Sequence, residues 1–149
     1  MNVFPIAPAQ SRYLWFILPI TLLLVSVILL LAATVRGSRG SRFEVRPEGL
    51  KLSGDLYGRT IPWNQLRIEM ARRVDLTNEP QLRPVSRRAG TALPGYQAGW
   101  FRLANGEKAL LYLTDRAKAV YVPTSANFSV LISPANPDGF VAALRSRAR

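Results

Sequence analysis

Residues 13–35 read YLWFILPITLLLVSVILLLAATV, a run of 23 positions without a charged side chain. As a helix this run is about 34 Å long, enough to cross a hydrocarbon core of about 30 Å. It therefore predicts one transmembrane helix. A cleaved signal peptide is the competing interpretation, since residues 31–34 resemble a cleavage site. Signal peptides, however, have an apolar region of only about 7–15 residues and a basic segment before it. The run here is longer, and the residues before Arg12 contain no base.

The basic residues on either side of this run predict its orientation. Only Arg12 and the terminal amine precede it, whereas several bases follow closely: Arg36, Arg39, Arg42, Arg46 and Lys51. Because the flank richer in Lys and Arg stays in the cytoplasm, we expect the N-terminus outside and the C-terminal part of the chain inside.

Composition narrows the chemistry that the chain can perform. The 149 residues include no cysteine and no histidine, which excludes disulfides, thiolate zinc sites, cysteine nucleophiles and a histidine base. There are 20 Lys+Arg against 9 Asp+Glu. Residues 36–149 hold all of these except Arg12, so their net charge is +10. This charge favours anionic partners such as lipid headgroups or an acidic protein surface. We expect no catalytic residue, metal or cofactor.

The chain is predicted to have four parts. Residues 1–12 form a leader, residues 13–35 the membrane helix, residues 36–42 a flexible basic linker and residues 43–149 one domain. The linker, RGSRGSR, contains Arg36, Arg39 and Arg42. Glycine and serine favour flexibility there, and bases near a membrane surface attract anionic lipid.

The domain reads as about seven short strands followed by one helix. Alternation of apolar and polar residues, broken by turn residues, predicts the strands. Eight segments are candidates, with a weak ninth at 82–88: residues 43–46, 50–53, 57–61, 66–76, 99–103, 108–113, 118–122 and 128–132. The strand at 66–76 should place Ile68 and Met70 on one side, and residues 77–96 read as a long irregular loop. Asn136 and Pro137 predict the start of the helix, and Phe140, Val141 and Leu144 its apolar face.

Four stretches resemble the bacterial PH-domain family: YGRTIPW at 57–63, RAGTALPGYQAGWF at 88–101, NGEK at 105–108 and ISPANPDGF at 132–140. The resemblance implies a bent antiparallel barrel of about seven strands, capped by a C-terminal helix, and no settled activity. Eukaryotic relatives that hold phosphoinositides use basic residues around the first hairpin loop. Here that turn, Pro47-Glu48-Gly49, is short and acidic, so the phosphoinositide site is not expected.

Candidate contact residues for an anion or lipid are all arginines: Arg36, Arg39, Arg42, Arg83, Arg87 and Arg88. The last three flank a glycine- and proline-containing stretch, and their planar donor forks suit phosphate or carboxylate. A solvated loop whose bases face the membrane is the simpler interpretation. Three aromatic residues, Trp63, Trp100 and Tyr112, are expected to serve in packing rather than to line a groove.

Two functions are compatible with these features of the sequence. The first is a non-catalytic interaction module, held by one helix in the bacterial cytoplasmic (inner) membrane, that recruits a protein partner of unknown identity. The alternative is a module that binds anionic lipid headgroups through its arginines. An enzyme is disfavoured because no catalytic constellation is present. Nucleic-acid binding is not expected, because the bases are scattered and no reading helix appears. The oligomeric state stays open.

Overall fold

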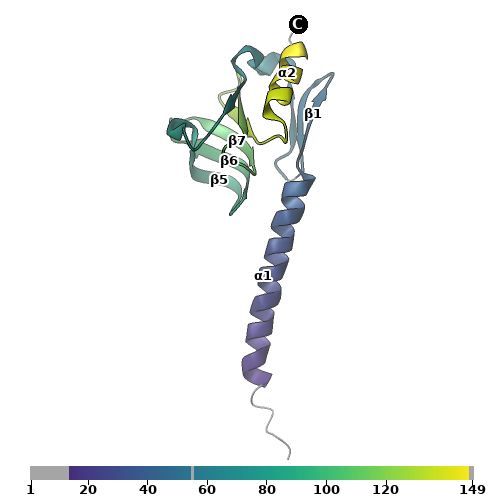
Figure 1. The fold of residues 1–149 in the computed structure, drawn as a ribbon, viewed down its shortest axis with the longest axis vertical. Coiled ribbons are helices and arrows are strands. Elements are labelled where there is room, and N and C mark those ends of the chain that lie inside the picture. The colour runs from purple at the N-terminus through teal and green to yellow at the C-terminus, as the bar shows by residue number, and fades with distance from the viewer. Residues whose placement is uncertain (1–13, 55, 148–149) are drawn as a thin grey trace, which may run out of the picture. The chain divides into compact units, whose positions relative to one another are not determined.

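The computed structural model describes residues 14–54 and 56–147 (Figure 1). The predicted leader, residues 1–12, lies outside the described residues. The chain divides into two compact units, Met1–Val35 and Arg36–Arg149. The second unit contains all the described strands, and we call it the PH-like domain.

Helix α1 runs from Leu14 to Gly40. Its segment Leu14–Ala33 is long and apolar enough to cross a membrane, and none of it is buried in the structure. The hydroxyl of Thr21 donates to the carbonyl oxygens of Ile17 and Leu18, and that of Ser26 to Leu22 at 2.8 Å. These polar groups are therefore satisfied within the helix, as an apolar environment requires. The same length and composition fit an N-terminal signal sequence.

The predicted flexible linker, residues 36–42, is wrong in part. The helix continues to Gly40, and Arg42 already begins the first strand, so Ser41 is the only residue between the two elements. Extending an existing helix adds one hydrogen bond for each residue that it orders, and this outweighs the flexibility suggested by two glycines.

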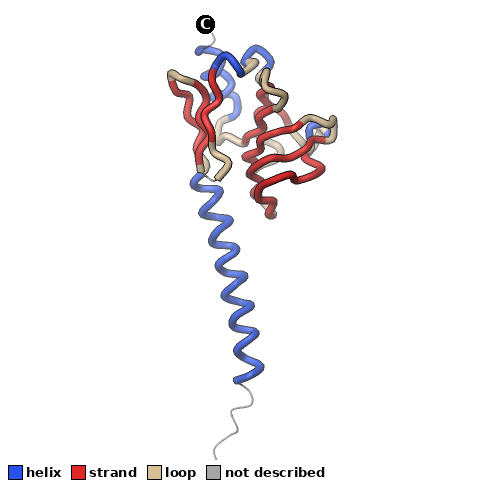
Figure 2. The backbone as a smooth tube through the Cα atoms, turned by 180° about the vertical axis from the view of Figure 1, so that it is seen from behind, coloured by secondary structure: helices blue, strands red, loops and turns tan. Residues whose placement is uncertain are grey.

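The PH-like domain contains two sheets and a final helix (Figure 2). The first sheet has the order β1-β2-β3, from β1 (Arg42–Arg46), β2 (Gly49–Ser53) and β3 (Arg59–Pro62). The second has the order β4-β8-β9-β7-β6-β5, from β4 (Arg72–Val74), β5 (Pro84–Leu93), β6 (Tyr96–Leu103), β7 (Lys108–Leu113), β8 (Ala119–Pro123) and β9 (Ser129–Ile132). Helix α2 (Pro137–Arg147) follows.

These elements confirm the predicted class: a mainly β protein with one N-terminal apolar helix and one C-terminal helix. Two details differ. The described residues form nine strands rather than about seven, and β7 pairs with β9 in parallel, whereas every other described pair is antiparallel.

Strand β7 separates two buried clusters. Leu110 and Tyr112 belong to the first cluster, together with β2, β3 and α2, while Leu111 and Leu113 belong to the second, beneath residues 74–82. All four side chains are at most 2% exposed. Because neighbouring side chains of a strand point to opposite faces, an apolar run of this kind is buried on both sides, as its sequence predicts.

Two predicted segments are wrong. Residues 66–76 form no single strand: a 3₁₀ turn (Ile68–Met70) precedes the short β4, and Ile68 is 5% exposed where Met70 is 53% exposed. Residues 77–96 are not one long loop, since half of them form the ten-residue strand β5, which overlaps the weak strand predicted at 82–88. Bulges at Val85 and Arg88 interrupt its pairing with β6, and they hide the alternation by which a strand is recognised.

Helix α2 begins as predicted. The side-chain oxygen of Asn136 accepts a hydrogen bond from the amide of Gly139 at 3.0 Å, which is the geometry of an N-cap. Val141 and Leu144 are buried, and Phe140 packs against the first cluster. The apolar face of the helix thereby closes one side of the core and leaves its basic residues exposed.

Candidate functional site

Arg83 forms contacts with the chain itself. Its Nε donates to the carbonyl oxygen of Leu76 at 2.5 Å, and its Nη2 donates to the carbonyl oxygen of Thr77. The amide of Ala104 donates in turn to the backbone oxygen of Arg83. Arg83 therefore ties residues 76–77 to the start of β5 through its Nε and Nη2 atoms. These two hydrogen bonds give Arg83 a structural role.

Arg87 and Arg88 lie on β5, an edge strand of the six-stranded sheet. Both are exposed, and neither side chain has an ion pair with another described residue. Arg87 is opposite Phe101, whereas Arg88 is the extra residue of a bulge. Charged side chains and bulges on an edge strand oppose pairing with another sheet, which is a structural reason for arginine at these positions.

The remaining predicted contact residues lie where the helix meets the first sheet. Arg36 is in the last part of α1, and Arg42 begins β1; both are exposed. Arg39 is also within α1, but its side chain lies outside what the structure describes. No described contact joins these arginines to Arg87 or Arg88, so the six predicted residues do not form a single described site.

A groove of about 610 Å³ between β4 and α2 brings other basic residues together. The sequence predicts only an exposed helix end and a strand at these places. The groove is lined by three arginines, one acid and three smaller residues: Arg72, Arg73, Arg145, Asp138, Val141, Ala142 and Ser146. Three guanidinium groups face one carboxylate of the lining, and Glu79 pairs with Arg72 beside it, so the net charge is +1 and the groove suits an anionic ligand.

Each arginine of the groove is held differently. Arg72 binds both oxygens of Glu79, at 3.0 and 2.7 Å, and this hydrogen bonding lowers the pKa of Glu79. Arg145 donates to the carbonyl oxygen of Ala71 at 3.0 Å. Arg73 has an ion pair with Asp138 at 3.0 Å, and the side chain of Asp138 is 72% exposed. An exposed pair of this kind contributes little, so Arg73 is the guanidinium most readily available to a ligand.

Sequence reasoning missed this groove because its residues come from positions far apart in the chain. Asp138 and Arg145 are recognisable as charges that suit the two ends of a helix, and Arg72-Arg73 as an adjacent basic pair. Only the packing of α2 beside β4 makes them neighbours.

A second cleft, of about 530 Å³, is built around Glu107. The Glu107 carboxylate accepts hydrogen bonds from the hydroxyls of Tyr121 and Ser129, both at 2.9 Å. Burial raises the pKa of Tyr121, so the phenol stays protonated and donates at neutral pH. This network joins the β6–β7 turn to β8 and β9. Glu107, Tyr121 and Ser129 therefore have a structural role in the cleft.

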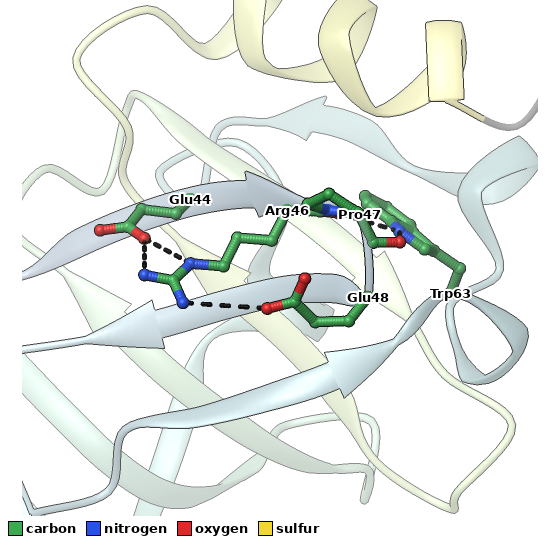
Figure 3. Close-up of polar contacts among 5 residues, drawn as sticks. All are labelled: Glu44, Arg46, Pro47, Glu48 and Trp63. Carbon is green, nitrogen blue, oxygen red and sulfur yellow. Dashed lines mark hydrogen bonds and ion pairs between the residues drawn. The ribbon is translucent and has the colours of Figure 1, made fainter.

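The β1–β2 turn, all of whose residues the structure describes, has no free basic cluster (Figure 3). Arg46 contacts Glu44 at 2.6 Å and Glu48 at 3.8 Å. The indole nitrogen of Trp63 donates to the carbonyl oxygens of Arg46 and Pro47, at 3.1 and 3.0 Å. The turn is thus fixed by its own contacts, and Arg46 is paired with two carboxylates.

The aromatic residues pack as expected. Tyr112 is 1% exposed, and Trp63 and Trp100 pack at the edge of the first cluster. Among residues 14–54 and 56–147, no group of three carboxylates is placed to hold a metal ion.

The domain has two sheets and a C-terminal helix, and it follows an apolar helix in the sequence. These features define the class of protein, a small PH-like β domain after an apolar segment. A family model described as "Bacterial PH domain" matches residues 41–148, and the chain belongs to that family. PH-like domains are generally non-catalytic modules. No curated protein and no solved structure matches the chain.

Proposed function

We propose that this protein is a membrane-anchored, non-catalytic PH-like module that recruits an acidic segment of a protein partner to the cytoplasmic face of the inner membrane. In this proposal α1 spans the membrane once, with the N-terminus outside. The groove between β4 and α2 is the recruiting site. It carries the proposal because Arg73 has only an exposed ion pair with Asp138 there, and Arg145 has no ion pair with a described residue.

The anchor is supported by the length and composition of Leu14–Ala33 and by the hydroxyls of Thr21 and Ser26, which bond within the helix. The bases after the apolar segment, among them Arg36 and Arg42, favour this orientation. A tethered domain meets membrane partners at a high local concentration, so even a weak groove contact is sufficient for recruitment.

The chemistry of the groove favours a carboxylate-bearing segment. An incoming carboxylate replaces Asp138 as the partner of Arg73 at little cost, because that exposed pair is weak. Arg145 uses one nitrogen for Ala71 and keeps further N–H donors. Val141 and Ala142 line the groove beside these charges and add apolar surface for the stem of a glutamate or aspartate.

Lipid binding is the second candidate. Arg87 and Arg88 are exposed without an acid partner in the described part of the chain, and they leave charge available for an anionic surface. Such binding weakens as ionic strength rises. It does not depend on the groove, and this separates the two functions experimentally.

The anchor is tested by C-terminal fusions and by alkaline extraction of membranes. We expect a C-terminal fluorescent-protein fusion to be bright, an alkaline-phosphatase fusion to be inactive, and the full chain to stay in the membrane pellet. An active phosphatase fusion would overturn the orientation. A mature product that begins near residue 34 and stays in the supernatant would identify a signal sequence instead.

The groove is tested with a defined probe, a fluorescent glutamate-rich peptide, added to full-length protein in detergent. We expect Arg73→Glu to weaken peptide binding at least tenfold, and the matched reversal Arg87→Glu to leave it within twofold. Vesicles of phosphatidylglycerol form the second arm. If Arg87→Glu reduces vesicle binding and Arg73→Glu has no effect on the peptide, the lipid function replaces the groove.

A further inference from the structure

Strand β4 is at one edge of the six-stranded sheet, since its only described neighbour in that sheet is β8. An edge strand has backbone N–H and C=O groups that no neighbouring strand pairs, and these groups can hold a further strand. The groove lined by β4 and α2 is at this strand. The direction of the β4 backbone groups therefore bears on the conformation of a segment bound there.

Hydrogen bonds on both sides of β4 establish this direction. The amide of Leu76 donates to the carbonyl oxygen of Arg116, which precedes β8. On the other side, the carbonyl oxygen of Ala71, a residue with extended backbone angles, accepts a hydrogen bond from Arg145 of α2 at 3.0 Å. In an antiparallel pair, residues bonded to the partner strand alternate with residues whose N–H and C=O point to the other edge. The backbone groups of Arg73 therefore point away from β8, to the side of Arg145.

The backbone of Arg73 has no partner in the described part of the chain. The alternation leaves it without a bond to β8, and no other described residue donates to its carbonyl oxygen or accepts from its amide. Arg73 is also exposed. One N–H and one C=O are thus free at this edge, which is enough for the two hydrogen bonds of one antiparallel residue pair.

The side chains of β4 separate the charges between two faces. Val74 belongs to the second buried cluster, and Arg72 is on the same face, where its guanidinium pairs with Glu79. Arg73 is on the opposite face, with its ion pair to Asp138 of α2. A strand added at this edge places every second side chain on the face of Arg73. An acid at such a position meets the guanidinium whose present ion pair is exposed and weak.

We propose that the acidic partner segment binds in the groove as an extended strand, which adds to β4 and exchanges backbone hydrogen bonds with Arg73. This inference rests on the proposed recruiting function of the groove. The added strand is selected for acids at alternate positions, on the face toward Arg73. Like charges directly opposite each other are destabilising, so the arginines of β4 disfavour a basic strand and the β4 edge of a second copy.

A fluorescent eight-residue peptide of alternating glutamate and threonine tests the backbone pairing. Threonine favours the extended conformation, and the alternation keeps all glutamates on one face even when the peptide shifts by two residues. One derivative is N-methylated at every glutamate amide, and the other at every threonine amide. The two derivatives carry the same side chains and the same charge, so they differ only in which backbone donors are lost.

We expect the unmethylated peptide to bind the full-length protein in detergent. Arg73→Glu should weaken this binding at least tenfold, and the control Arg87→Glu should leave it within twofold. One N-methylated derivative should bind at least tenfold more weakly than the parent peptide, and the other within threefold of it. Loss on methylation of glutamate identifies an antiparallel strand, because directly opposite residues then exchange both bonds. Loss on methylation of threonine identifies a parallel one.

Equal affinities of the two derivatives overturn the inference. They leave the groove intact as the recruiting site when Arg73→Glu still weakens binding of the parent peptide. If the parent peptide does not bind, or if Arg73→Glu has no effect on it, the recruiting function of the groove is overturned, and the inference with it.

Discussion

Nε of Arg83 donates to the carbonyl oxygen of Leu76 at 2.5 Å. This contact connects two ends of the segment that covers the second buried cluster, in which Leu76 is 0% exposed. An arginine that the sequence suggests as an anion ligand thus has a structural role. Because the hydrogen bond has a charged donor, it is stronger than a neutral one.

We therefore expect Arg83→Ala to lower the free energy of unfolding by about 1–3 kcal/mol, the range for a hydrogen bond to a charged group. Arg87→Ala should change it by less than about 0.5 kcal/mol, as for an exposed residue without partners. Denaturant unfolding of the full chain in detergent, followed by tryptophan fluorescence, measures both. Equal values for the two variants would contradict the role assigned to Arg83.

Gly99 of the β5–β6 hairpin is predicted not to tolerate a side chain. It is opposite Gly90, its φ is +115°, and a Cβ there would be 2.4 Å from the backbone oxygen of Ala89. Gly99→Ala combines backbone strain of about 1–3 kcal/mol with overpacking of a similar size. We expect a loss of roughly 2–5 kcal/mol in unfolding free energy.

The control for this experiment is Gly95→Ala, in the turn of the same hairpin. Its φ is +77°, but no described atom lies within 4 Å of the added Cβ, so only the strain of about 1–2 kcal/mol remains. Hydrogen exchange of the β5 amides should accelerate in Gly99→Ala more than in Gly95→Ala. A larger acceleration in Gly95→Ala would show that the close approach of the two backbones at Gly99 is not the cause of the destabilisation.

Acid pH should loosen the segment before β5. Hydrogen bonds from the hydroxyl and amide of Thr77 lower the pKa of Asp75, and the hydrogen bond from Arg72 lowers that of Glu79. A carboxylate whose pKa is lower in the folded state stabilises the fold fully above its unfolded pKa, about 4. That stabilisation disappears as the pH falls through the folded value.

We expect the urea midpoint to be flat from pH 7 to about 5 and to fall below about 4. Glu79→Gln should have a lower midpoint at pH 7 and a shallower decline in acid, because it no longer loses a charge. Both residues are partly exposed to solvent, so solvent screening keeps these effects modest. An identical acid decline in wild type and Glu79→Gln would refute the contribution of the Arg72 pair.

Two leucines allow the stability contribution of the second buried cluster to be compared with that of the surface. Leu111 is 0% exposed and Leu56 is 96% exposed. Leu111→Ala should cost about 2–5 kcal/mol through lost burial and a cavity, whereas Leu56→Ala should cost less than about 0.5 kcal/mol. Thermal unfolding of the full chain in detergent measures both. A large loss for Leu56→Ala would mean that Leu56 packs in the folded protein.

The local sequence pattern was sufficient to predict an element wherever one physical rule acts over a few residues. The apolar segment, the alternation in β1 and β2, the doubly buried β7 and the Asn136 cap are all recognisable in the sequence. Each depends on contacts within one element or on a side-chain period of two or 3.6 residues. The family resemblance depends on turn residues of the same local kind.

The local sequence pattern was insufficient to predict an element where contacts with residues distant in the chain decide its conformation. Strand β5 is exposed along much of its length and bulged at Val85 and Arg88, so its sequence gives only the weak strand signal at 82–88. Pairing with β6 defines the full strand. Residues 66–76 contain apolar side chains at alternate positions, yet the 3₁₀ turn buries Ile68 and exposes Met70. Tertiary packing overrides the pattern in both cases.

The sequence by itself determined that an uncharged helix precedes a basic, mainly β domain without histidine or cysteine, because composition and short-range periodicity are properties of neighbouring residues. The tertiary structure decided which arginines support the fold and which face a groove. Arg83 turns toward two backbone carbonyls, while Arg72, Arg73 and Arg145 meet only where α2 packs beside β4. All of these are the same residue type in the sequence, and only folding gives each of them its partners.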